Sequence, residues 1–280
     1  MPTIVLIPSG DVMLRLTTYH GALLIRPRSI LGLFCALLVS TPVAAQNPWA
    51  KVPALSTSCY SAGDPFTDQI EAAFVANQDA IGRQEQINRG LNDQLKSIAP
   101  SVMQTRMMAY MQKDPAGFHA YMKDMAGDPQ SVQAAMAADN ARLAALNKEF
   151  ATLIANYSAE SKATLDPVAA EMLRVTDAAS TAPNAERAAA IAKYNAAYVA
   201  ICNKWIVKQN FPAFFAKFKA YMVENHVPVA ESLGLVTKRS MEMAGINTKD
   251  YQSTERLQAV SKYIDYIRTV YSLRRRQPQG

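Results

Sequence analysis

Apolar residues recur every three or four positions through most of the chain after residue 64, which is the spacing of amphipathic helices. Runs in which apolar and polar residues alternate, as in a strand, are almost lacking. Four Asp-Pro pairs punctuate the pattern, and in each pair the aspartate can cap a helix that begins at the proline: Asp64-Pro65, Asp114-Pro115, Asp128-Pro129 and Asp166-Pro167. The pattern predicts an all-α protein.

The expected helices number about seven to nine, and no long linker separates them. We therefore expect one bundle-like helical domain over residues 64–276, followed by a flexible tail at 277–280. Gly234 and Gly245 suit positions just beyond a helix end. The expected helices cover residues 65–99, 101–112, 115–126, 129–157, 167–179, 184–209, 211–225 and 248–275, with shorter pieces at 228–233 and 235–244.

The first expected helix has polar residues in the middle of its apolar seam. Asn77, Gln84 and Asn88 lie between Phe74 and Leu91 at the same spacing as the apolar positions. Such a seam can pack antiparallel to another helix. We expect its polar centre to be either hydrated or hydrogen-bonded.

A different pattern marks the N-terminus, where an apolar run at residues 30–39 follows two arginines and precedes small residues at 43–45. This order is typical of a secretory signal peptide, and the run is shorter than the roughly 20 residues of a membrane-spanning helix. We expect residues 1–45 to be a signal peptide cleaved near Ala45. An extended lead-in over 46–63 would then begin the mature protein, which would be periplasmic or secreted.

Removal of that segment from the 280-residue chain leaves 235 residues and lowers the net charge from +6 to +4. Part of the excess lies in Arg274-Arg275-Arg276, which we expect to form a solvated helix end where cations oppose the helix dipole. No nucleic-acid-binding motif accompanies the charge, so we expect no nucleic-acid partner. Glycine is scarce, 11 residues in all, which disfavours a phosphate-binding loop.

Two cysteines remain after cleavage, Cys59 and Cys202. An oxidising compartment favours a disulfide between them, which would attach the lead-in to the helix at 184–209. The competing interpretation is two separately buried thiols. Neither cysteine lies in a CxxC pair, so the sequence does not indicate a redox enzyme.

Methionine is concentrated in one region: seven of the eleven methionines of the mature chain lie between residues 103 and 136. Thioether and imidazole groups are soft ligands that suit Cu(I) or Ag(I). In its local spacing the region resembles the Met/His repeats of periplasmic copper- and silver-binding proteins, which implies a soft-metal site formed by Met103, Met107, Met111, His119, Met122 and Met125. Two other interpretations are a helical core filled by methionine and an adaptable binding surface.

A second cluster combines aromatic and basic residues around 204–221. Its aromatic members could form a helix face that lies on a membrane surface or lines an apolar ligand groove. The alternative, which the frequencies of such patterns favour, is the aromatic centre of the bundle with lysine stems covering its edge. The candidate residues are Trp205, Phe211, Phe214, Phe215, Phe218 and Tyr221.

Catalytic signatures are few. The chain has no GxSxG, HExxH or CxxC motif, and a triad or zinc site in the mature chain would have to use His119 or His226. His226 lies two residues before Pro228 and is expected in a turn between helices. Glu231-Ser232 resembles the Glu-Ser pair of lytic transglycosylases, but the Gly-Leu-Met-Gln element of that family is absent downstream.

These observations favour a protein that acts by binding, in an interaction or chaperone-like role, without an evident catalytic centre and without a cofactor. Adaptable methionine and aromatic side chains would bind apolar segments of a protein partner or an envelope component, with peripheral membrane contact as a further option. Cu(I) or Ag(I) binding is the alternative function, and a peptidoglycan-directed enzyme is the third. The sequence identifies neither the partner nor the oligomeric state.

Overall fold

A computed structural model describes residues 47–59, 64–126, 129–177 and 179–276. Within these ranges the regular structure is helical and no strand occurs, so the predicted all-α class is confirmed. The predicted signal peptide at 1–45 and the predicted tail at 277–280 lie outside the described residues. None of the described helices combines the length and the hydropathy that a membrane crossing requires.

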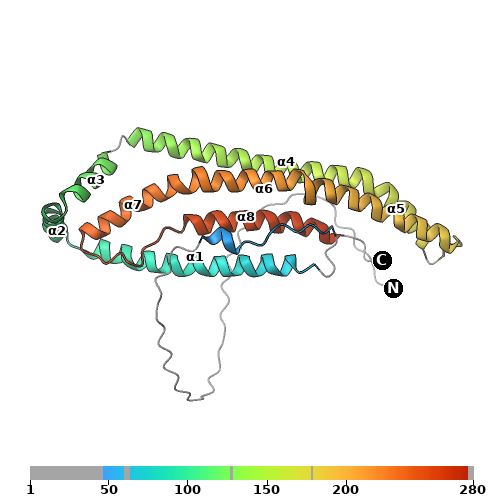
Figure 1. Ribbon diagram of the computed structural model, residues 1–280, viewed down its shortest axis with the longest axis horizontal. Coiled ribbons are helices and arrows are strands. Elements are labelled where there is room, and N and C mark those ends of the chain that lie inside the picture. The colour runs from blue at the N-terminus through green and yellow to red at the C-terminus, as the bar shows by residue number, and fades with distance from the viewer. Residues whose placement is uncertain (1–46, 60–63, 127–128, 178, 277–280) are drawn as a thin grey trace, which may run out of the picture. The chain divides into compact units, whose positions relative to one another are not determined.

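Long helices pack side by side in two sets. Helix α1 lies along α8, and α4 lies along α5 and α6 (Figure 1). Two short helices, α2 and α3, contact each other and α7. The bounds are α1 Phe66–Ser97, α2 Pro100–Lys113, α3 Pro115–Ala126, α4 Pro129–Thr176, α5 Asn184–Cys202, α6 Asn210–Tyr221, α7 Val227–Met243 and α8 Glu255–Ser272.

The Asp-Pro pairs begin helices at three of the four predicted places. At α3, for example, Asp114 caps the helix through its carboxylate, which accepts a hydrogen bond from the Gly117 amide at 2.9 Å. The prediction was wrong at Asp166-Pro167, because Pro167 lies inside the continuous helix α4. Packing of α4 along α5 offsets the lost backbone hydrogen bond there, which a local signal cannot reveal.

Residues 184–243 were expected to form two helices and two shorter helical pieces, but they run almost continuously. Six-residue and five-residue π-helical segments, Asn203–Lys208 and Met222–His226, join α5 to α6 and α6 to α7. Each segment ends shortly before a proline, Pro212 or Pro228. A proline clashes with the carbonyl four residues before it, and the wider π turn relieves that clash without ending the helix.

The two glycines that were expected to end helices behave differently. Gly245 follows α7 and has φ +72°, the left-handed conformation of a helix terminus, as predicted. Gly234 lies within α7, so the expected break there is wrong. A side chain at 234 would be in ordinary contact with the Tyr251 hydroxyl, at 3.6 Å, so the glycine is not required by the backbone.

The polar seam of α1 binds the backbone around the start of α8. Asn77 donates to the Leu257 carbonyl at 2.8 Å, and Asn88 donates to the Gln252 carbonyl at 2.7 Å. Gln84 donates to the Asp250 carbonyl at 2.9 Å. The predicted polar centre is therefore hydrogen-bonded, and it holds the α7–α8 connection in place.

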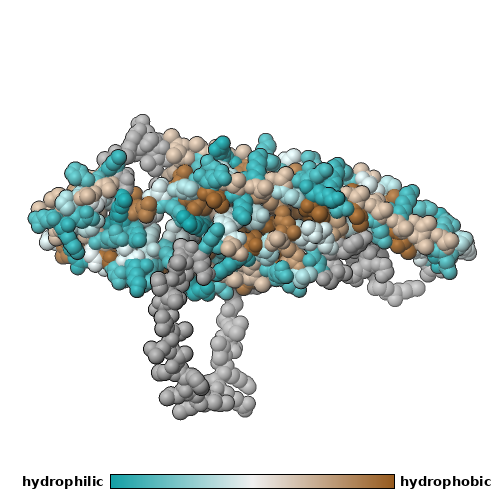
Figure 2. Space-filling model, in the orientation of Figure 1, coloured by the Kyte–Doolittle hydropathy of each residue, from teal (hydrophilic) through white to brown (hydrophobic). Residues whose placement is uncertain are grey.

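A large aromatic and aliphatic core lies where α4, α6 and α8 meet, and it includes Phe150, Phe211 and Tyr263. Many of its rings are in edge-to-face or stacked contact. A smaller apolar cluster of Leu91, Met241, Ala244 and Ile246 lies where α1 meets the end of α7. The face drawn in Figure 2 mixes hydrophilic residues with hydrophobic ones, which are visible along the middle of the molecule.

Candidate functional site

The six aromatic residues proposed as a membrane or ligand surface lie in the core. Each is at most 8% exposed, and Phe211 and Phe218 are fully buried. Trp205 contacts both Tyr157 and Phe211, so its ring belongs to the same packed set. The surface interpretation of Trp205, Phe211, Phe214, Phe215, Phe218 and Tyr221 is therefore wrong for the described structure, because α4 and α8 cover this face of α6.

The methionines of α2 divide by their direction around the helix. Met103 packs against the small cluster of Leu91 and Met241, and Met107 is half-buried. Met108 and Met111 are 53% and 39% exposed. Of the predicted soft ligands on α2, Met103 therefore packs against buried apolar residues, whereas Met111 is exposed.

Helix α3 carries the rest of the predicted soft-ligand set. His119 is exposed, and Met122 is 44% exposed. The side chain of Met125 lies outside the described residues. Helices α2 and α3, which carry the predicted soft-ligand set, contact each other.

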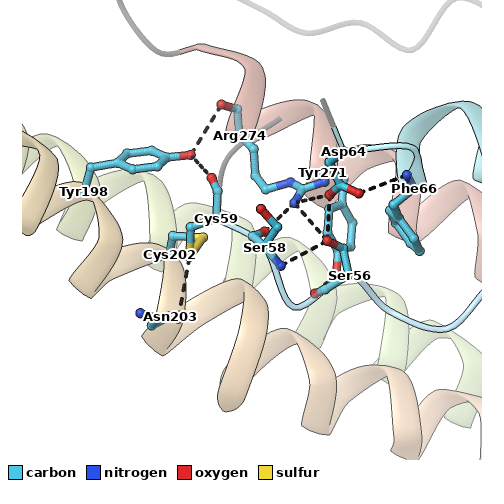
Figure 3. Close-up of polar contacts among 10 residues, drawn as sticks. All are labelled: Ser56, Ser58, Cys59, Asp64, Phe66, Tyr198, Cys202, Asn203, Tyr271 and Arg274. Atoms are coloured by element: carbon cyan, nitrogen blue, oxygen red, sulfur yellow. Dashed lines mark hydrogen bonds and ion pairs between the residues drawn. A yellow bond between two sulfur atoms is a disulfide. The ribbon is translucent and has the colours of Figure 1, made fainter. Parts of the chain in front are cut away.

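The predicted disulfide is present and attaches the lead-in to α5. Cys59 and Cys202 are bonded, with Cα atoms 5.7 Å apart and 143 residues between them in sequence. The Tyr198 hydroxyl donates to the Cys59 carbonyl at 2.9 Å. Figure 3 shows these groups together with a second attachment point, in which Arg274 reaches the same segment from the end of α8.

Arg274 is 1% exposed, so the expectation of a solvated arginine at this helix end is wrong. Its guanidinium donates to the Ser58 carbonyl and lies 3.2 Å from an Asp64 carboxylate oxygen. The same group stacks on the Tyr271 ring, with 4.1 Å to the centroid. A buried charge persists only when it is paired, and this pairing fixes the C-terminal helix to the residues that precede α1.

Asp64 is the acceptor at the centre of this attachment. Burial opposes its ionisation, but hydrogen bonds from the Ser56 hydroxyl and the Phe66 amide, together with the Arg274 charge, lower the pKa of Asp64 below its ordinary value. Arg274 Nε and Nη2 have no hydrogen-bond partner among the described residues. The attachment therefore holds by one ion pair and several backbone contacts.

A cavity of about 380 Å³ opens between α1, α4, α7 and the start of α8. This volume is within the range of small-molecule sites. Its lining mixes apolar groups with amides, hydroxyls, carboxylates and an imidazole. The lining residues are Asn88, Met136, Asp139, Asn140, His226, Val229, Ala230, Gly234, Thr237, Tyr251, Ser253, Thr254 and Glu255.

The best-defined polar group on the cavity wall is a pair formed by Asp139 and His226. The imidazole Nδ1 lies 2.7 Å from one Asp139 carboxylate oxygen, and both side chains are mostly buried. Tyr221 donates its hydroxyl to the other carboxylate oxygen. Burial and the neighbouring Asp139 charge raise the pKa of Tyr221, so this hydroxyl stays protonated and is held as a donor.

With Nδ1 held by Asp139, the Nε2 atom of His226 is the nitrogen left for a ligand. His226 is the last residue of a π-helical segment, a feature that is often found at functional sites. The predicted turn at His226 is therefore wrong. The pairing itself could not be predicted, because 87 residues separate its two members in sequence.

Glu255 supplies a second carboxylate at the cavity, in the first turn of α8. Burial and, to a smaller extent, the Glu255 charge raise the pKa of Tyr251. No salt bridge to Glu255 occurs among the described residues, and none of the described lining residues is a lysine or an arginine. Of the two carboxylates on the cavity wall, Asp139 is paired with His226, and Glu255 has no ion-pair partner among the described residues.

Glu231 and Ser232, the pair that resembles lytic transglycosylases, are engaged in structural contacts. Glu231 forms a two-point ion pair with Arg256, at 2.6 and 2.9 Å, and raises the pKa of that arginine. The Ser232 hydroxyl donates to the Val229 carbonyl of its own helix at 2.7 Å. Both side chains are therefore engaged in contacts within the protein.

No protein-family model, no curated protein and no solved structure significantly matches the chain. No group of three or more His, Cys, Asp or Glu side chains in the described ranges is arranged to hold a metal ion. The class of the protein is therefore defined by its own architecture, a disulfide-linked all-α fold with one polar cavity described among its long helices.

Proposed function

We propose that the protein is exported, loses its signal peptide near Ala45, and works in the periplasm or outside the cell by binding apolar segments of other polypeptides. Its role would be chaperone-like and would require no cofactor. The observation that supports this proposal is the methionine surface, defined here as Met108, Met111 and Met122 on α2 and α3. These flexible side chains are 39–53% exposed on two helices that contact each other.

Methionine suits this role because its unbranched, polarisable side chain adapts to different apolar shapes. Helix α2 contains no fully buried residue and packs through its half-buried face. The outer face is therefore free to contact a client without disturbing the large core. The disulfide and the Arg274–Asp64 ion pair lie in other elements and would keep the fold intact in an oxidising compartment.

The client-binding proposal can be tested with citrate synthase that is unfolded in guanidinium and diluted into buffer without reductant, so that the disulfide stays intact. The mature protein is expected to suppress the light scattering of the aggregating client. The triple variant Met108→Gln, Met111→Gln and Met122→Gln is expected to lose most of this suppression, because it removes the apolar surface while leaving buried residues unchanged.

The matched control replaces three exposed apolar residues elsewhere, Leu173→Gln, Ile191→Gln and Val223→Gln. Each exposed substitution should change the free energy of unfolding by no more than about 0.5 kcal/mol, so both triple variants should remain folded. Equal loss of suppression in both variants would show nonspecific apolar binding. Full suppression by the methionine variant would remove the methionine surface from consideration.

Export has its own test. The full-length chain, expressed in a bacterium, is expected to yield a periplasmic product whose N-terminal residue is Gln46, because the small residues at 43–45 precede that position. Edman sequencing or intact mass measures the cut. A cytoplasmic product that retains residues 1–45 would contradict the proposal.

Soft-metal binding is the second candidate, and the accessibility of Met111, Met122 and His119 favours it. Thioether and imidazole ligands from adjacent helices can bind Ag(I) or Cu(I). Titration with Ag(I) is expected to saturate at a defined stoichiometry, with weaker binding after Met107→Leu and Met111→Leu. Failure of the wild-type protein to compete with a Cu(I) chelator would exclude this function.

A further inference from the structure

We infer that the cavity between α1, α4, α7 and the start of α8 is a binding site for a small organic amine, separate from the methionine surface. The cavity contributes two carboxylates, Asp139 and Glu255, and its described lining contains no lysine or arginine. An anionic ligand would find no counter-charge there. A cationic ligand would find one at Glu255.

The two carboxylates differ in what they can offer. Both Asp139 oxygens are engaged within the protein, one by the Tyr221 hydroxyl and the other by the His226 imidazole. Glu255 has no ion-pair partner among the described residues, although it is only partly exposed. Glu255 lies in the first turn of α8, where the partial positive charge of the helix N-terminus favours a carboxylate.

His226 supplies a second contact for an amine. When Nδ1 carries the proton and donates it to Asp139, Nε2 has a lone pair that can accept an N–H hydrogen bond. Asp139 and Tyr221 hold the imidazole in place, so the acceptor is positioned before the ligand arrives. Charge recognition by Glu255 and hydrogen-bond recognition by His226 together specify a protonated amine rather than a neutral alcohol.

The remaining lining specifies the rest of the ligand. Met136, Val229 and Ala230 give apolar contacts, and Tyr251 adds an aromatic ring near Glu255. An aromatic face attracts an ammonium group as well as an alkyl chain. A volume of about 380 Å³ accommodates a short alkyl or aryl amine.

Isothermal titration of the mature protein at pH 8 tests the assignment, with hexylamine, 1-hexanol and sodium hexanoate as probes of matched length. At this pH an ordinary alkylamine is charged. Hexylamine is expected to bind at one site per chain and at least tenfold more tightly than the alcohol. Hexanoate is expected to bind more weakly still.

Two variants locate the site. Glu255→Gln is expected to weaken hexylamine binding about tenfold or more and to leave hexanol binding within twofold, whereas Glu85→Gln, an exposed carboxylate of α1, should bind like the wild type. Ala230→Leu fills the cavity and is expected to abolish binding of both probes, with circular dichroism to show that the helices remain.

Three results would overturn the inference: equal affinity for the three probes, a preference for hexanoate, or no binding of hexylamine by the wild type. Retained affinity in both Glu255→Gln and Ala230→Leu would also overturn it, because binding would then lie elsewhere. None of these outcomes bears on client binding by the methionine surface, which uses different residues.

Discussion

Arg274 is the first of three consecutive arginines at a helix end, a sequence context that is typical of a solvated, basic terminus. Its burial depends on Asp64 and on the carbonyl of Ser58, which lie more than 200 residues earlier in the chain. The local pattern is compatible with either outcome. The environment of this side chain is therefore decided by tertiary contacts that the sequence pattern does not contain.

Removal of the buried charge should be costly. Arg274→Met is expected to lower the free energy of unfolding by about 3–5 kcal/mol, because Asp64 would be left without its ion-pair partner. Arg174→Met is the matched control, since Arg174 is 61% exposed in its pairs with Glu171 and Glu186. The control should change stability by less than about 1 kcal/mol. Urea unfolding followed by circular dichroism measures both, and equal effects would contradict the structural role.

Asp64 makes the same contact sensitive to acid. The pKa of Asp64 is lower in the folded state than in the unfolded state. Its ionised carboxylate therefore contributes fully to stability above the unfolded-state pKa of about 3.9, and this contribution is lost as the pH falls through the folded-state pKa. Asp64→Asn should therefore be less stable than the wild type at pH 7. The difference should shrink below about pH 4, and a difference that stays constant down to pH 2 would contradict this linkage.

At the scale of the helix, the two glycines of α7 and its terminus give a matched pair. Gly234→Ala is expected to stabilise the protein by about 0.5–1 kcal/mol, because alanine favours the helix interior and the added methyl group meets no atom closer than 3.6 Å. Gly245→Ala is expected to destabilise it by about 1–2 kcal/mol, because φ is +72° there. Thermal unfolding of the two variants tests the opposite signs, and a shift in the same direction for both would contradict the assignment of the helix end.

Much of the helical arrangement could be predicted from local patterns, and the exceptions have a common cause. Asp114 caps a helix and Gly245 ends one, as their local chemistry indicates. Pro167 carries the same signal as the other Asp-Pro pairs, yet packing against α5 overrides it. Prediction failed where a neighbouring helix supplies the stabilisation that the local sequence lacks.

The candidate cavity was less predictable than the helices. The sequence singled out His226 as one of the two histidines after residue 45, but it did not indicate that Asp139 would hold it. Glu255 has the pattern of an ordinary acidic residue in a first helical turn. Their shared location follows from the packing of α4, α7 and α8, and only the three-dimensional arrangement reveals it.

At the scale of the whole molecule, stability is distributed unevenly among the described helices. Helices α6 and α8 contribute many buried side chains to the large core, whereas α2 contributes none that is fully buried. Native-state hydrogen exchange should therefore show α6 and α8 amides exchanging only with global unfolding. Amides of α2 should exchange through a local opening of lower free energy. Equal opening free energies in α2 and α8 would contradict this distribution.

The bond between Cys59 and Cys202 also determines how the chain would carry mechanical load. A pull applied at residues 47 and 276 would pass directly through the disulfide, so the residues between the two cysteines, which are 143 positions apart, would bear no tension. This segment, which would be about 500 Å long if fully extended, could not be stretched while the disulfide is intact. Helices α1 to α4, and α5 up to Cys202, lie within this bypassed stretch, and only reduction of the bond would expose them to force.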